Sequence, residues 1–444
     1  PVGDDASLRA LVDAGTQVCA IFGKSWRLHV ERVLRTTGDE NLRMIEDSVA
    51  WLVGNGRRVI YDAEHFFDGW RADAAYAIET LRAAARGGAE TLALCDTNGG
   101  SLPWQIAETV AAVVAADVGA RLGIHAHDDS GCAVANTLAA VRAGARHVQG
   151  TINGYGERCG NANLCTVLPD LELKLGLQTI GALGIAQLTD VARFVGELTG
   201  VGPDDSLPFV GKSAFAHKGG VHVAAMRLER ASYEHVDPAA VGNRTRVVVS
   251  ELAGRAALMA KAAEHGVELA SADAAPLIGR IKERERDGFA FESAEASTVL
   301  LMRRHAADYR APFKLVAYHV TSGRAGESTP YADAALTIDV GGRIVATAAR
   351  RPGPVSALDA ALREALEPSF PELGKMRLSD YHVRIIDGRD GTGAVTRVLV
   401  ESTDGARVWR TLGASDNVVE ASWQALADSV EYALAAPATQ AVAS

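Results

Sequence analysis

The chain has 444 residues, 48% of them hydrophobic and 23% charged, which predicts two or three domains of a soluble globular protein, and its size favours an enzyme. Its formal net charge of −10 argues against nucleic acid or an anionic membrane as a general partner, and we find neither a membrane-spanning apolar run nor a signal-like start. The five cysteines form no Cys-x-x-Cys pair, which predicts reduced thiols and a cytoplasmic location.

Residues 1–175 alternate short apolar segments with amphipathic ones. Strands are predicted at Val18–Gly23, Val59–Glu64, Thr91–Asp96, Leu122–His127 and His147–Asn153. Continuous apolar strands separated by helices indicate an α/β domain with a parallel sheet covered on both faces. Their spacing is close to the roughly 31 residues per unit of an eight-unit (β/α) barrel, and polar residues end four of the five strands. A doubly wound open sheet is the alternative fold.

Only five such units are visible, whereas a closed barrel has about eight. The chain also begins at Pro1, without an initiator methionine. We therefore expect a partial TIM barrel that lacks its first three units, roughly ninety residues.

Two histidines end the fourth predicted strand. Residues two apart on a strand share a face, so His125 and His127 are expected to project together. The Gly-rich segment after the next strand ends in Asn161, another oxygen donor. Imidazole, amide and water ligands suit Mn²⁺, Mg²⁺ or Zn²⁺ in an open site. Structural histidines are also common, so the spacing alone leaves both interpretations open.

Residues 176–310 lose the strand pattern. Apolar residues recur at helical spacing in 188–198, 251–266 and 292–305, around an irregular stretch rich in glycine and histidine. We interpret this part as a set of helical linker subdomains that carry a functional loop.

Residues 311–436 predict a different domain. Three alternating strands are followed by a helix opened by Gly353 and Pro354, and the same order then repeats. Two βββα units indicate an α+β module without an obvious nucleophile or ligand cluster. This pattern favours ligand sensing or dimerisation over catalysis. Residues 437–444 are expected to form a flexible tail.

Seven motifs together resemble the citramalate synthase family, within the isopropylmalate and homocitrate synthase superfamily. They span nearly the whole chain, at Asp62–Gly69, Leu94–Gly100, His125–Asp129, Gly150–Asn161, Phe215–His222, Tyr233–Pro238 and Leu378–Arg384. The resemblance implies an acyltransferase that condenses acetyl-CoA with pyruvate and water, giving (R)-citramalate and CoA in isoleucine biosynthesis. It also implies a divalent metal, a homodimer and a regulatory domain that binds an effector such as isoleucine.

The resemblance assigns roles to barrel residues. It implies that His125, His127 and Asn161 hold the metal. Glu64 matches the family's catalytic glutamate, although a strand-end carboxylate is otherwise most often merely solvated. Thr97 resembles the residue that binds the oxo-acid carboxylate, with a helix N-cap as its structural alternative.

Three further residues complete the expected site. Asn153, at the end of the fifth predicted strand, is a candidate for substrate binding. His222 and Tyr233 resemble a pair that the family's linker region contributes to the partner subunit's active site. The family pattern implies that His222 assists proton transfer and that Tyr233 places the reacting groups.

The match departs from the family pattern at the front of the chain. The family's first strand ends in Asp-x-x-x-Arg-Asp-Gly, which supplies a metal-ligating aspartate and a catalytic arginine, and no such motif precedes residue 18. We therefore expect no turnover from this chain alone. 2-Isopropylmalate or homocitrate synthase remains an alternative activity, and a non-catalytic dimerisation or effector-binding fragment is an alternative of another class.

Overall fold

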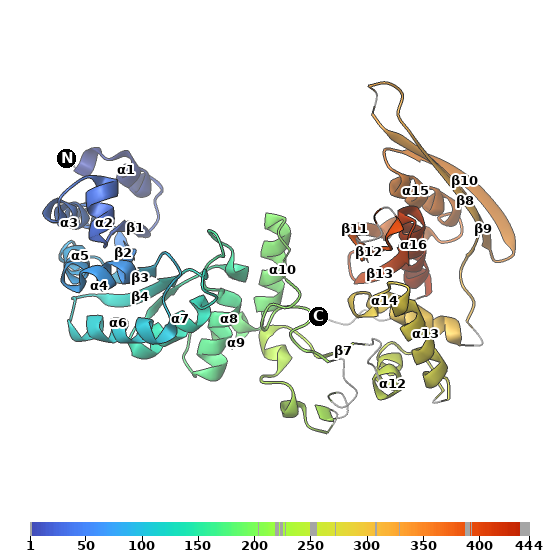
Figure 1. Cartoon of the computed structure of the whole chain (residues 1–444), viewed down its shortest axis with the longest axis horizontal. Helices are drawn as coiled ribbons and strands as arrows, with labels where there is room; N and C mark the ends of the chain where they lie inside the picture. The colour runs from blue at the N-terminus through green and yellow to red at the C-terminus, as the bar shows by residue number, and fades with distance from the viewer. Residues whose placement is uncertain are drawn as a thin grey trace. The chain divides into compact units, whose positions relative to one another are not determined.

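The computed structural model describes residues 2–435 except 203, 218–221, 223–224, 227, 249–254, 271, 307–308, 328, 387–390 and 392. The chain divides into two compact units (Figure 1). Unit 1 comprises Pro1–Phe215 and Val236–Arg244, and unit 2 comprises Ala216–His235 and Thr245–Ser444. The division at residues 175, 310 and 436 therefore stays a prediction, and the expected tail lies outside the described residues.

A five-stranded sheet forms the centre of unit 1. The strands pair in the order β1-β2-β3-β4-β5, and each pair is parallel. They are β1 Val18–Lys24, β2 Arg58–Glu64, β3 Thr91–Asp96, β4 Arg121–Ala126 and β5 His147–Gln149. All six residues of β3 are buried, whereas β2 alternates buried and partly exposed residues, so one face of the sheet is covered more completely than the other. Strands in sequential order are the wall of a (β/α) barrel, whereas a doubly wound sheet reverses its order at a switch point.

Amphipathic helices connect these strands (Figure 1). In α5, for example, Ala77, Leu81 and Ala84 recur at helical spacing and are fully buried. The helices are α1 Ala6–Asp13, α2 Arg27–His29, α3 Gly38–Gly54, α4 Phe66–Ala72, α5 Ala74–Arg86, α6 Pro103–Ala115, α7 Ala133–Ala143, α8 Leu164–Pro169, α9 Gly181–Ile185 and α10 Leu188–Thr199.

The fifth strand is shorter than predicted. Pairing with β4 stops at Gln149, whereas the apolar pattern extended the strand to Asn153. The chain leaves the sheet because Asn153 takes a left-handed conformation, φ 62°, inside the 3₁₀ turn Ile152–Gly154.

Unit 2 begins with short elements and helices. Two-residue strands β6 Ala216–His217 and β7 Arg246–Val247 pair in parallel, within a stretch predicted to contain no strand. The helices are α12 Arg255–Glu264, α13 Ala274–Arg286 and α14 Glu295–His305. Of the predicted helix 251–266, residues 251–254 lie outside the described residues.

Two βββα halves follow, as the repeat predicted (Figure 1). The first comprises β8 Lys314–Gly323, β9 Tyr331–Val340, β10 Arg343–Arg351 and α15 Pro354–Leu366. The second comprises β11 Arg377–Ile385, β12 Thr396–Thr403, β13 Val408–Ser415 and α16 Val418–Ala435. Both sheets are antiparallel, and one helix packs on each. In the part of the chain that the structure describes, we find no helix long and apolar enough to cross a membrane.

An ion-pair network links α14 to α16, with the carboxylates largely buried and the Arg304 side chain 38% exposed. Arg304 donates to both oxygens of Glu431, at 2.8 and 2.6 Å, and to Asp428 at 2.7 Å. Tyr309 donates to Glu431 at 2.9 Å. Burial alone would lower the pKa of Arg304, but the two carboxylates raise it above its usual value. The helical segment and the second βββα half are therefore one packed structure.

Candidate active site

The carboxyl ends of the parallel strands gather polar side chains at one edge of the sheet. Glu64 ends β2, Asp96 ends β3, His125 is the penultimate residue of β4, and Gln149 ends β5. In parallel (β/α) sheets this edge carries the chemistry. The expectation that the strand ends form one site is therefore supported by their register.

The two imidazoles predicted to share a face of β4 lie side by side. The ring centroids of His125 and His127 are 5.1 Å apart, and the backbone of His127 forms an isolated bridge with Asn161. Nδ1 of His127 and Oδ1 of Asn161 are buried and have no hydrogen-bond partner among the described residues. Because such atoms are rarely left unsatisfied, and because imidazole and amide donors suit a divalent cation, these residues fit the implied metal.

Two neighbouring features adapt this group to a cation. Burial, followed by the charges of His125 and Arg158, lowers the pKa of His127, which favours the neutral ring that a ligand requires. The amide nitrogen of Asn161 donates to the carbonyl of Tyr155 at 3.4 Å, so the amide oxygen is the atom of this side chain that can bind a cation.

The Gly-rich loop before Asn161 needs two of its glycines. Gly160 has φ +97°, and a Cβ there would lie 2.1 Å from the carbonyl oxygen of Gly154. A Cβ on Gly156 would lie 2.3 Å from the amide nitrogen of Asn161. These positions allow the backbone to fold closely around the asparagine.

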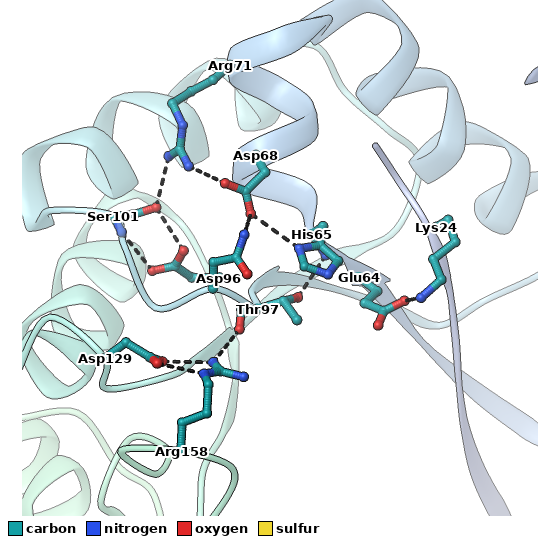
Figure 2. A network of polar contacts seen from close by, with 11 residues as sticks. Lys24, Glu64, His65, Asp68, Arg71, Asp96, Thr97, Ser101, Asp129 and Arg158 are labelled. Carbon is teal, nitrogen blue, oxygen red and sulfur yellow. Dashed lines mark hydrogen bonds and ion pairs between the residues drawn. The ribbon is translucent and has the colours of Figure 1, made fainter. Parts of the chain in front are cut away.

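Glu64 forms an ion pair with Lys24, the last residue of β1 (Figure 2). The side chains are 23% and 16% exposed, so the pair is neither a solvated surface contact nor fully buried. The carboxylate of Glu64 is therefore accessible to a small molecule, with the ammonium group of Lys24 beside it.

Thr97 is fixed by contacts from two other strand-end loops. Its hydroxyl oxygen accepts a hydrogen bond from the backbone N–H of His65 at 2.8 Å, and its carbonyl accepts from Arg158 at 2.7 Å. Arg158 also binds both oxygens of Asp129, at 2.6 and 2.8 Å. The following helix, α6, is capped by Leu102, so Thr97 is not its N-cap. Within the described residues, its hydroxyl accepts a hydrogen bond and makes none as a donor, so its hydrogen can be donated to a ligand.

A charged network supports His65 (Figure 2). His65 is buried in a left-handed conformation, φ 56°, and its Nδ1 lies 3.3 Å from Asp68. Burial would raise the pKa of Asp68, but His65 and Arg71 lower it below its usual value. The network continues through Ser101 to the fully buried Asp96. Because His65 is both buried and strained, the turn after β2 that follows Glu64 is tightly constrained.

Asn153 is not brought to this cluster. Its amide nitrogen donates to the carbonyl of Ala192 in α10 at 2.8 Å and to the hydroxyl of Tyr155 at 3.2 Å. The side chain is buried against α10. Because these contacts occupy the amide, we do not carry Asn153 into the proposed site.

His222 and Tyr233 lie together in unit 2. Their rings stack with centroids 4.1 Å apart, and Tyr233 meets His217 edge to face at 6.3 Å. Behind them, His217 and Glu234 are buried, and Thr245 donates to Glu234. The predicted pair thus packs against the buried residues His217 and Glu234. Residues 218–221 of the same loop lie outside the described residues.

A second cluster of possible ligands lies in unit 2. Within the described residues, Glu264, His265 and Glu295 place their ligand atoms within 4.8 Å of one another. The buried ammonium of Lys261, however, pairs with both glutamates. Burial would raise the pKa of Glu295, but the hydrogen bond from His265 and the charge of Lys261 lower it to about 2. The ammonium group of Lys261 already occupies the place between the carboxylates, which argues against a metal ion there.

Several residues of the strand-end cluster escaped the sequence analysis. Lys24 was detectable in principle, because it directly follows the first predicted strand. His65 and Arg158 stand within matched motifs but carried no local signal of their contacts. Gln149 gave no signal, because it lies within an ordinary strand pattern.

Three family models match successive parts of the chain. An HMGL-like model matches residues 3–195, a homocitrate synthase post-HMGL domain-like model matches 209–288, and a LeuA allosteric (dimerisation) domain model matches 292–434. The first confirms the α/β barrel class, and the last confirms the α+β module.

Two relatives match nearly the whole chain. The (R)-citramalate synthase of Synechocystis sp. is 49% identical over 98% of this chain and 82% of that protein. The (R)-citramalate synthase of Aquifex aeolicus is 49% identical over 98% of this chain and 83% of that protein. Among solved structures, the HMG-CoA lyase of Bacillus subtilis is 20% identical, with a TM-score of 0.40, over 44% of this chain and 68% of that one. That structural likeness is too low to add weight to the two sequence matches.

Proposed function

We propose, since this chain belongs to the (R)-citramalate synthase family, that the full-length protein condenses acetyl-CoA with pyruvate and water to give (R)-citramalate and CoA. The observation that carries this conclusion is 49% identity over 98% of the chain to relatives of that name. The convergence of His125, His127 and Asn161 at the strand ends supports it.

The reaction begins with removal of a proton from the acetyl methyl group. We assign this step to the carboxylate of Glu64, with Lys24 beside it. The resulting carbon nucleophile attacks the carbonyl carbon of pyruvate, whose carboxylate accepts a hydrogen bond from the hydroxyl of Thr97. Water then cleaves the thioester and releases CoA.

A divalent cation held by His125, His127 and Asn161 would polarise the pyruvate carbonyl. Mn²⁺, Mg²⁺ and Zn²⁺ all suit the donor set. The alkoxide formed by this addition takes up a proton, and we assign that proton transfer to His222 and placement of the reacting groups to Tyr233. The family pattern implies that this stacked pair serves the active site of the partner subunit.

We also propose a homodimer, isoleucine as the effector, and a place in isoleucine biosynthesis. The LeuA allosteric (dimerisation) match at residues 292–434 supports the dimer. The effector, the pathway and a cytoplasmic location remain predictions from the sequence.

Thiol release by the purified full-length protein, with acetyl-CoA and each of three 2-oxo acids, tests this function. We expect kcat/KM for pyruvate to exceed that for 2-oxoisovalerate by about 10- to 200-fold, the range that a few methyl groups confer in an apolar pocket. Preference for 2-oxoisovalerate or 2-oxoglutarate would instead indicate an isopropylmalate or homocitrate synthase. Absence of thiol release with all three would favour the non-catalytic alternative.

A further inference from the structure

A chain of hydrogen bonds leads away from the histidine pair across three strands. Nδ1 of His125, in β4, lies 2.7 Å from Oε1 of Gln149, the last residue of β5. Nε2 of Gln149 donates to Oδ1 of Asp62, in β2, also at 2.7 Å. The three side chains are partly buried. Since β3 and β4 lie between β2 and β5 in the sheet, the contact of Gln149 with Asp62 joins strands that are not neighbours.

With Asp62 ionised, the donors and acceptors of these three side chains have only one consistent arrangement. An ionised Asp62 can only accept, so Gln149 must turn its NH₂ group toward it. The carbonyl oxygen of Gln149 then faces His125, so Nδ1 of His125 must carry the hydrogen. The neutral ring therefore has its lone pair on Nε2, the other nitrogen, which can bind a cation.

We propose that Asp62 and Gln149 are positioning residues that fix the tautomer and ring orientation of His125 for the metal. This proposal rests on the proposed function, because it assumes that His125 is a ligand. Carboxylate partners of metal-binding histidines commonly act in this way, and here a glutamine relays the carboxylate's effect. His127 has no such partner, since its Nδ1 is buried without a hydrogen bond among the described residues.

Asp62→Asn provides the sharpest test. An asparagine amide can donate to Oε1 of Gln149 as well as accept from its NH₂ group, so Gln149 is no longer held in one orientation and can turn its NH₂ group toward His125. The imidazole would then carry its hydrogen on Nε2 and lose its ligand lone pair. We expect the dissociation constant for Mn²⁺, measured by titration calorimetry on the full-length protein, to rise about 10- to 100-fold. Gln149→Leu, which removes the relay, should have an effect in the same range.

The tautomer itself gives a readout that needs no metal. Histidine ¹⁵N chemical shifts of the metal-free protein, with the His125 signals assigned from the His125→Ala spectrum, should show an unprotonated Nε2 in the wild type. In Asp62→Asn both tautomers should be populated, with part of the hydrogen on Nε2. Thr137→Val is the control, because Thr137 also lies in unit 1 and is more deeply buried, but its hydroxyl donates within α7, to the carbonyl of Ala133.

The outcomes separate the relay from the metal site. The relay alone would be overturned if Asp62→Asn and Gln149→Leu both kept the wild-type Mn²⁺ affinity and the wild-type tautomer of His125, while His125→Ala bound Mn²⁺ more weakly. An Mn²⁺ affinity unaffected by His125→Ala would overturn the metal site, while the ¹⁵N shifts would still decide whether Asp62 sets the tautomer. Circular dichroism of each variant checks that it has folded.

Discussion

Replacing Glu64 with glutamine is expected to lower kcat for citramalate formation by about 10²- to 10⁴-fold, the usual contribution of a positioned general base. Glutamine keeps the shape of the side chain but cannot accept the proton of the acetyl methyl group. The melting temperature should change little, because the ion pair with Lys24 is partly exposed and contributes modestly to stability. Steady-state thiol release with saturating acetyl-CoA and pyruvate measures the effect.

Glu79→Gln is the matched control for this variant. Glu79 lies on α5 in the same unit, also pairs with a basic residue, Arg82, and is 42% exposed. Its replacement should leave kcat unchanged. A Glu64→Gln protein that keeps more than about a tenth of the wild-type kcat would contradict the assignment of Glu64 as the base.

The second large effect is expected from His127→Ala. Removing a ligand should weaken Mn²⁺ binding by at least about 100-fold, since loss of a residue that merely supports a ligand already costs about 10- to 100-fold. At a fixed, limiting Mn²⁺ concentration we expect kcat/KM to fall by about 10³-fold, equivalent to several kcal/mol of lost charge stabilisation. Calorimetry and thiol release measure the two effects separately.

His265→Ala distinguishes the two candidate clusters. If the cation binds at the strand ends, this variant should bind Mn²⁺ like the wild type, because the ammonium of Lys261 already pairs with both Glu264 and Glu295 and takes the place of a metal there. The reverse result, weak binding in His265→Ala and normal binding in His127→Ala, would move the metal site to unit 2.

Much of the fold could be predicted because the relevant signals are local. The apolar run Thr91–Asp96 predicted β3 with its exact bounds, since every residue in it is buried. In contrast, α13 was not predicted. Its buried residues Ala274, Leu277 and Ile281 have helical spacing, but the charged residues around them hide the pattern.

The site was predictable only in part, because some of its contacts follow from local strand geometry and others join residues far apart in the sequence. The shared face of His125 and His127 follows from strand geometry, so the sequence alone predicts their proximity. The contact of Gln149 with Asp62 joins residues 87 positions apart, and only the sheet order brings them together. The anchoring of Asn153 to α10 likewise depends on tertiary packing. Such contacts leave no periodic trace in the sequence.

Locating the bound cation in crystals soaked with Mn²⁺, by anomalous diffraction, tests the central claim most directly. We predict an anomalous peak between the imidazoles of His125 and His127 and the amide oxygen of Asn161. A peak at Glu264, His265 and Glu295 instead, or none at the carboxyl ends of the strands, would contradict it.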